Sequence, residues 1–250
     1  MRQRLWGEAL GSYFLFATVV GSGIMAEQMA GGNVAVALLG NTIATAAMLF
    51  VLITMLGPVS GAHFNPAVSL VMRLRGDCCW QGLAATMAAQ LLGGVLGVCT
   101  AHAMFDLPEL QVSTHFRDGP GQWLGEFIAT FGLVTTILLT VRHRPAAVPA
   151  SVALYITAAY WFTSSTSFAN PAITLARSLS DTFAGIAPGS VAGFITAQFA
   201  GALAALQITD CSLLRIHDLY VDGGTTGGGI ALGGSLKGDR CRLVDIERVG

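Results

Sequence analysis

The residue pattern best suited to a chemical role in this sequence is the triplet Asn-Pro-Ala, which occurs at 65–67 and again at 170–172. Proline favours the first turn of a helix, so each asparagine is expected to cap a short helix. A capping asparagine turns its side-chain oxygen onto the helix amides, and its own N–H groups can then point outward. One copy alone would indicate only a turn that opens a helix. Two copies predict a pair of hydrogen-bond donors, the side-chain amides of Asn65 and Asn170. The two motifs consist of Asn65, Pro66 and Ala67, and of Asn170, Pro171 and Ala172.

The composition is typical of a membrane protein. Of the 250 residues, 53% are hydrophobic and 11% are charged, whereas soluble proteins average about 25% charged residues. The net charge of -1 and the lack of a basic stripe interleaved with aromatic residues argue against a nucleic-acid partner. The five cysteines have no Cys-x-x-Cys spacing, which predicts free thiols and neither a metal site nor a cofactor.

Six apolar runs have about the 20 residues that a spanning helix needs. They cover residues 5–25, 34–56, 81–101, 123–141, 149–168 and 189–208. The first run is long enough to span, so it is predicted to be a retained helix and not a cleaved signal. Segments 67–75 and 172–179 follow the triplets and are predicted to be half-helices, because about nine residues at 1.5 Å each cover only about half of the hydrocarbon core.

The spans and half-helices divide equally on either side of the loop 106–119. Each half holds three spans and one half-helix, and an odd number of spans inverts the second half relative to the first. The predicted fold is therefore an all-α membrane protein of six transmembrane helices plus two half-helices in an inverted repeat. Repeat one covers about 1–105 and repeat two about 120–208. Residues 209–250 combine glycine runs with charges of both signs, which predicts a flexible tail.

Positive charges near the ends of the spans predict the orientation, since cytoplasmic loops are enriched in Lys and Arg. One side has six arginines, which are Arg2, Arg4, Arg73, Arg75, Arg142 and Arg144, and the other side has Arg117 and Arg177. Both termini are therefore expected in the cytoplasm, and the tail with them.

The stretch 60–68, the second triplet, the six-span plan and the paired openings Gly7-Glu8 and Gly125-Glu126 resemble the aquaporin family, also called major intrinsic proteins. The resemblance covers residues from about 5 to 208. It implies a channel in the cell membrane and a homotetramer whose monomers each have a pore, narrowed at the Asn-Pro-Ala junction and at an outer filter. It also implies that Glu8 and Glu126 accept hydrogen bonds from the irregular backbone before the half-helices. A proton relay is the alternative for these carboxylates.

The residues give a physical basis for such a channel. Two helix N-termini that meet at the midplane place roughly half a positive charge each at the pore centre, which repels cations. A neutral solute can instead accept hydrogen bonds from the Asn65 and Asn170 amides in place of the water that it loses.

The family's filter positions, carried over by their offsets from the two asparagines, fall on Thr45, Ala158, Ser167 and Ile173. Ile173 stands where water-selective members and most glycerol-conducting members carry arginine. This filter is expected to be wider and more apolar, so that small polyols such as glycerol, metalloid acids such as arsenite, and water pass. In this respect the sequence resembles a bacterial subgroup associated with metalloid acids.

Two further side chains are candidates for the pore mouth. Arg177 lies one helical turn beyond Ile173 and could line the mouth, or it could extend to the membrane interface or pair with Asp181. His63 could face the cytoplasmic mouth or hold its loop through a backbone hydrogen bond.

No enzymatic constellation is present, since no serine lies in Gly-x-Ser-x-Gly and the histidines and acids form no recognisable triad. Three alternative functions remain besides a channel for small uncharged solutes. They are a strict water channel, a structural or adhesive membrane protein of the same fold, and a gradient-coupled transporter, which would need an acid at the substrate site.

Overall fold

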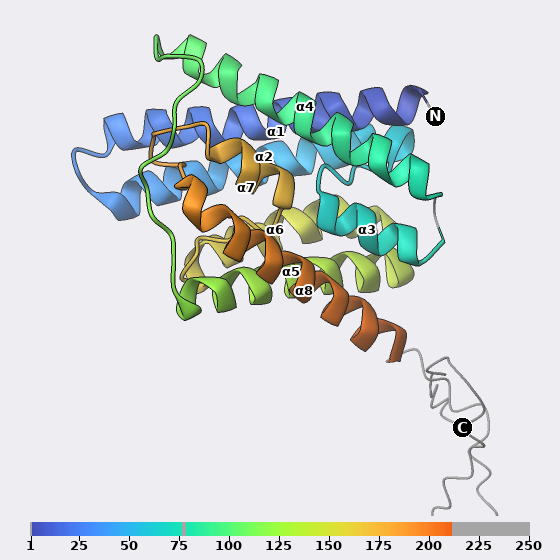
Figure 1. Cartoon of the computed structure of the whole chain (residues 1–250). Helices are drawn as coiled ribbons and strands as arrows, with labels where there is room; N and C mark the ends of the chain where they lie inside the picture. The colour runs from blue at the N-terminus through green and yellow to red at the C-terminus, as the bar shows by residue number, and fades with distance from the viewer. Residues whose placement is uncertain (1, 77–78, 212–250) are drawn as a thin grey trace, which may run out of the picture. The chain divides into compact units, whose positions relative to one another are not determined.

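Six helices of the described chain are long and apolar enough to cross a membrane. The computed structural model describes residues 2–76 and 79–211, and these ranges fold into helices and their connections (Figure 1). In chain order the helices are α1 (Arg2–Met29), α2 (Val34–Ser60), α3 (Pro66–Leu74), α4 (Trp80–Met104), α5 (Pro120–His143), the 3-10 turn η1 (Pro145–Ala147), α6 (Val148–Phe162), α7 (Pro171–Arg177) and α8 (Pro188–Cys211). The predicted fold is confirmed, with α1–α4 in the first half and α5–α8 in the second.

Most helix ends differ from the predicted ones by a few residues, and two of the differences concern the site or the tail. Helix α6 ends at Phe162, whereas the fifth span was predicted to continue to residue 168. The segment that follows is rich in serine and threonine, whose hydroxyl groups compete for backbone hydrogen bonds. Helix α8 continues to Cys211, past residue 209, where the tail was predicted to begin. The rest of that predicted tail, 212–250, lies outside the described residues.

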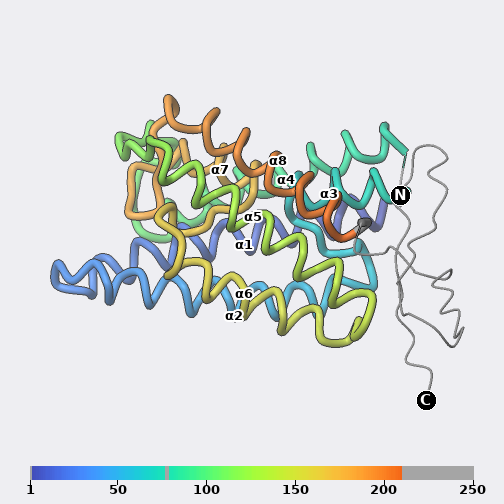
Figure 2. Tube along the Cα trace, turned by 90° about the horizontal axis from the view of Figure 1, so that it is seen from below, coloured from blue at the N-terminus to red at the C-terminus, as the bar shows by residue number. Residues whose placement is uncertain are grey.

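The half-helices α3 and α7 begin close together and run toward opposite ends of the bundle (Figure 1, Figure 2). We call these ends the α3 end and the α7 end. The Asn65 side-chain oxygen accepts a hydrogen bond from Ala67 N at 2.9 Å, and the Asn170 oxygen accepts one from Ala172 N at 3.0 Å. These caps satisfy amides that have no partner within their own helix. Both helices lie in the unit Met1–Ala205, and a second unit covers Leu206–Gly250.

Glycines allow the first and third spanning helices of each half to pack closely. A Cβ atom at Gly93 of α4 would lie only 2.1 Å from the carbonyl oxygen of Ala9 in α1. In the second half, a Cβ atom at Gly201 of α8 would lie 2.3 Å from the carbonyl oxygen of Phe127 in α5. Membrane helices commonly use small residues for such contacts. The same crossing therefore recurs in both halves and holds the half-helices in equivalent surroundings.

Candidate functional site

The two capping asparagines reach across to the opposite half. Asn65 Nδ2 donates to the carbonyl oxygen of Ala169 at 2.7 Å, and Asn170 Nδ2 donates to the carbonyl oxygen of Phe64 at 2.8 Å. Each acceptor is the residue directly before the other asparagine, so the two bonds form a reciprocal link. A side-chain amide carries two N–H donors. One N–H of each asparagine therefore joins the halves, and the other remains for a molecule beside it.

A buried glutamate accepts hydrogen bonds from the loop before each half-helix. Glu8 accepts from the backbone N–H groups of His63 and Phe64, at 3.0 and 2.8 Å. Glu126 accepts from the N–H groups two and one residues before Asn170, both at 2.8 Å. Both carboxylates are fully buried. Within a membrane these backbone donors would otherwise have no acceptor, because water is excluded there.

The same loops adopt backbone conformations that residues with side chains rarely adopt. The φ angle is +50° at Ala62 and +48° at Phe64, and it is +52° at Ser167 and +48° at Ala169. These are the positions three and one before each asparagine. A left-handed residue other than glycine costs roughly 1–2 kcal/mol, so surrounding contacts must hold it in place. The glutamate hydrogen bonds fall on this stretch in both halves.

Two glutamines that sequence reasoning missed connect the glutamates to the half-helices. Gln90 Nε2 donates to Glu8 Oε2 at 2.7 Å and to Ser69 Oγ at 2.9 Å. Gln198 Nε2 repeats this arrangement, with the second glutamate at 2.6 Å and Thr174 Oγ1 at 2.8 Å. The hydroxyl residue follows its asparagine by four positions in both halves. That shared offset is the signal from which the sequence could have indicated the network.

A cavity of about 140 Å³ lies beside the asparagine pair. Both asparagines line it, together with the loops before them and side chains from the surrounding helices. Its lining extends from Met72 in α3 to Arg177 in α7, so the cavity reaches both half-helices on either side of the pair. The lining is mainly apolar with a few polar groups, which suits small neutral molecules. The volume is large enough for several water molecules.

Comparison with known proteins identifies the family. A family model described as "Major intrinsic protein" matches residues 1–165. The chain belongs to the major intrinsic protein family. It is 55% identical over 208 residues to "Aquaglyceroporin AqpS" of Rhizobium meliloti (strain 1021), covering 83% of this chain and 89% of that protein. "Probable aquaporin NIP-type" of Nicotiana alata is 32% identical over 137 residues, which is 54% of this chain and 49% of that protein.

A solved structure shares the fold of this major intrinsic protein. The aquaglyceroporin from Plasmodium falciparum superimposes with a TM-score of 0.66 at 20% sequence identity, covering 83% of this chain and 94% of that chain. At this identity the likeness concerns the fold alone. With six apolar helices and its family membership, the chain is a multi-pass membrane protein, as its composition predicts.

Three of the four predicted filter residues of this major intrinsic protein line the cavity, namely Thr45, Ser167 and Ile173. The structure corrects the fourth, because Ala158 is exposed on the outer face of α6. Tyr160 lines the cavity instead, and its hydroxyl lies 3.4 Å from Thr45 Oγ1. Residues two apart on a helix point about 200° away from each other. The offset carried over from the family therefore does not fit the connection between α6 and α7 in this chain.

The two candidate mouth residues also line the cavity. The Nδ1 atom of His63 lies 3.1 Å from Ser69 Oγ, so the ring both faces the cavity and is held by a hydroxyl group. Arg177 is 4% exposed, which rules out an arginine that extends to the membrane interface. The alternative partner of Arg177, Asp181, instead accepts two hydrogen bonds from Thr114.

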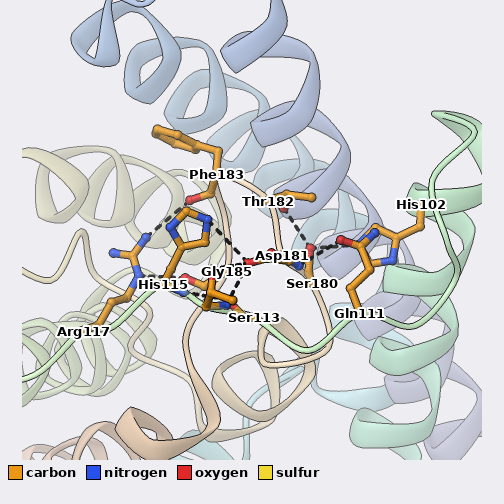
Figure 3. A network of polar contacts seen from close by, with 11 residues as sticks. His102, Gln111, Ser113, His115, Arg117, Ser180, Asp181, Thr182, Phe183 and Gly185 are labelled. Carbon is orange, nitrogen blue, oxygen red and sulfur yellow. Dashed lines mark hydrogen bonds and ion pairs between the residues drawn. The ribbon is translucent and has the colours of Figure 1, made fainter.

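The connection between α4 and α5 is fastened to the segment after α7 (Figure 3). Gln111 N donates to the carbonyl oxygen of Leu179 at 3.1 Å. The buried His102 ring lies 2.8 Å from Ser180 Oγ through Nε2. The end of α4 and the connection after it are thus both bonded to the segment after α7, and together they form one cover at the α7 end. In the part of the chain that the structure describes, no group of three His, Cys, Asp or Glu side chains could hold a metal ion.

The carboxylate in this cover leads to a prediction about pH. Asp181 Oδ1 accepts hydrogen bonds from Thr114 N at 2.8 Å and from Thr114 Oγ1 at 2.9 Å. The backbone bond is the main cause of a lowered Asp181 pKa. The ionised form therefore stabilises the cover above the ordinary carboxyl pKa of about 4, and this stabilisation is lost as the pH falls through the lowered pKa.

The measurement compares the native protein with Asp181→Asn, which keeps an acceptor oxygen but no charge. We expect the native protein to have the higher melting temperature at neutral pH and this difference to shrink below about pH 4. A difference that stays constant down to about pH 2.5 would contradict a role for the charge.

Proposed function

We propose that this chain is a passive transmembrane channel for small uncharged solutes, namely glycerol-like polyols, metalloid acids such as arsenite, and water, and that it excludes ions and protons. The observation that carries the proposal is the cavity beside the asparagine pair, which reaches both half-helices. Family membership and the relative named "Aquaglyceroporin AqpS" support a channel for small solutes. Passage requires no bond to be made or broken, so the proposal includes no catalytic residue and no cofactor.

Hydrogen-bond exchange at the asparagines is proposed to let neutral solutes pass. A solute oxygen accepts from the second N–H of Asn65 and Asn170, which replaces hydrogen bonds to water. The first turns of α3 and α7 add positive partial charge at the same place. Cations are repelled there, whereas neutral solutes meet only donors.

Thr45, Tyr160, Ser167 and Ile173 are proposed to form the narrow filter near the α7 end. Three of them offer hydroxyl groups, and Ile173 offers an apolar wall at the position where the family resemblance implies a guanidinium. A polyol has hydroxyl groups on one side and carbons on the other, so both surfaces suit it. A filter with few fixed donors cannot strongly reject a neutral solute somewhat larger than water.

The substitution Ile173→Arg tests this filter. We expect glycerol and arsenous acid flux to fall at least about tenfold, which needs only about 1.4 kcal/mol of added barrier, because the guanidinium narrows the passage. Part of the water flux should persist. Stopped-flow light scattering of proteoliposomes measures all three solutes, and Ile173→Val, which keeps the apolar wall, is the matched control.

Unchanged glycerol flux in Ile173→Arg would mean that Ile173 does not lie at the constriction. Native protein that conducts water but neither glycerol nor arsenous acid would support the strict water channel instead. Native protein that conducts none of the three would support the structural or adhesive alternative.

Orientation and assembly are part of the proposal. The α3 end, where Arg73 and Arg75 lie, is proposed to face the cytoplasm, with both termini and the segment 209–250 on that side. Repeats over 1–105 and 120–208 would then form one pore, in a homotetramer within a bacterial inner membrane. Large apolar side chains exposed on the outer helix faces, such as Leu92 and Leu154, suit contact with lipid or with neighbouring copies.

A further inference from the structure

Arg177 brings a permanent charge into the cavity lining at the last residue of α7. Its side chain is 4% exposed and lines the cavity. A guanidinium has five N–H donors and stays protonated at all ordinary pH values. A buried charge of this kind is unfavourable unless the surrounding groups hold it, so the contacts of Arg177 indicate what the charge is for.

The described contacts of Arg177 fix the guanidinium without neutralising it. The Nε–H group donates to the carbonyl oxygen of Ala184. The guanidinium carbon lies 3.3 Å from the centroid of the Phe168 ring, a cation–π contact. A carbonyl group and a ring orient the guanidinium but carry no negative charge. The buried Glu126 acts on Arg177 electrostatically, but its oxygens accept hydrogen bonds from the loop before α7 and from Gln198, and among the described residues it forms no ion pair with Arg177. The positive charge therefore remains at the cavity lining.

A second guanidinium reinforces the same end. Arg117, from the connection between α4 and α5, places its guanidinium carbon 5.1 Å from the centroid of the same Phe168 ring. Its Nε–H donates to the carbonyl oxygen of Gly185 at 2.8 Å, and Nη2 lies 3.4 Å from the carbonyl oxygen of Phe183 (Figure 3). Arg117 thus supports the segment that holds Arg177, and it adds a like charge behind it.

The first half of the chain has no charge at the position that corresponds to Arg177. Counting from the two asparagines, Arg177 corresponds to Met72, since each lies seven residues after its asparagine, and both line the cavity. Val68 and Ile173 correspond in the same way at three residues and are both apolar. The two halves therefore match at the nearer position and differ at the farther one, where only the α7 end has a charge.

We propose that Arg177 adds a second and stronger cation barrier to the one at the asparagine pair, positioned by Phe168 and Ala184 and reinforced by Arg117. This inference rests on the proposed channel function. A neutral solute meets a hydrogen-bond donor at this point, whereas a cation meets a full positive charge in surroundings of low dielectric, where like charges repel strongly. The guanidinium one helical turn beyond Ile173 would then separate ions from neutral solutes while the apolar Ile173 position stays open to polyols.

The test measures potassium efflux and glycerol flux on the same proteoliposomes. Arg177→Met introduces the residue type of the other half, and Arg177→Gln removes the charge while keeping a donor for the Ala184 carbonyl. We expect potassium efflux to rise roughly tenfold or more in both variants, because a unit charge is removed from the path. Arg177→Lys keeps a charge and should leak far less than either.

A second guanidinium placed nearby separates electrostatics from packing. In the double variant Ile173→Arg with Arg177→Met, the charge returns to the path one turn earlier, so the potassium leak should be suppressed. A glycerol-conducting Arg177→Gln variant that is as tight to potassium as the native protein would overturn the inference. A leak in the double variant equal to that of Arg177→Met would also overturn it. Glycerol flux through the native protein is read separately, so absence of that flux would refute the channel function itself.

Discussion

Replacing Glu126 by alanine is expected to abolish most solute flux and to lower the free energy of unfolding by roughly 3 kcal/mol or more. The substitution leaves the N–H groups of Phe168 and Ala169 and the Nε2 donor of Gln198 without their acceptor. Each buried unsatisfied donor costs about 1–3 kcal/mol. The loop also contains left-handed residues that the carboxylate helps to hold. Thermal unfolding in detergent and glycerol flux in proteoliposomes measure the two effects.

Three variants make this prediction specific. Glu8→Ala should behave like Glu126→Ala, because the first glutamate has the equivalent bonds in its own half. Glu126→Gln should be intermediate, since one acceptor oxygen remains while the new NH₂ group faces a donor. Glu27→Ala, at an exposed position of α1, should have almost no effect. Equal stability and flux in Glu126→Ala and Glu27→Ala would contradict the supporting role of the buried carboxylate.

Asn170→Ala is expected to destabilise the protein by about 2–4 kcal/mol and to reduce glycerol flux strongly. The loss of a helix cap costs about 1 kcal/mol, and a further 1–3 kcal/mol comes from the buried Phe64 carbonyl that loses its donor. The cavity also loses one of its two asparagine donors. Melting temperature and stopped-flow glycerol uptake report the two consequences.

The chain offers a matched control for this variant at another N-cap. Asn33 caps α2 by accepting hydrogen bonds from Ala35 N and Val36 N, but it is exposed and is not among the residues that line the cavity. Asn33→Ala should therefore cost only about 1 kcal/mol and leave glycerol flux intact. If the two variants had equal stability and equal flux, the cross-link between the halves would have no energetic role.

The spanning helices and half-helices followed from simple sequence patterns. Apolar runs of sufficient length located all six spans, and Asn-Pro located the start of α3 and of α7. The end of α6 could not be found in this way. The predicted span included the five hydroxyl residues 163–167, whereas the helix ends before them, where the backbone turns into a left-handed loop that leads to Asn170.

The lining of the candidate filter was predicted only in part. Thr45, Ser167 and Ile173 were found from their offsets, because α2, the loop just before Asn170 and α7 have the expected register relative to the asparagines. Tyr160 was missed in favour of Ala158, since an offset counted across an irregular connection is reliable only when that connection has the assumed length. A shift of two residues turns a helix to its opposite face.

Long-range contacts were the least predictable part of the site. The hydrogen bond from Asn65 to Ala169 joins two loops that lie far apart in the sequence. The contacts of Gln90 and Gln198 likewise depend on how the third span of each half packs against the first. Sequence offsets describe positions along one helix, but they do not contain the distance between two helices that meet only in the folded protein.

The most direct test of the central claim is glycerol flux through native protein reconstituted in liposomes, measured at several glycerol gradients with and without an imposed membrane potential or pH gradient. A passive pore for neutral solutes predicts uptake well above that of protein-free liposomes, proportional to the glycerol gradient and unchanged by voltage or pH gradient. Uptake no faster than in empty liposomes, or uptake that follows the voltage or the proton gradient, would contradict the channel between the two half-helices.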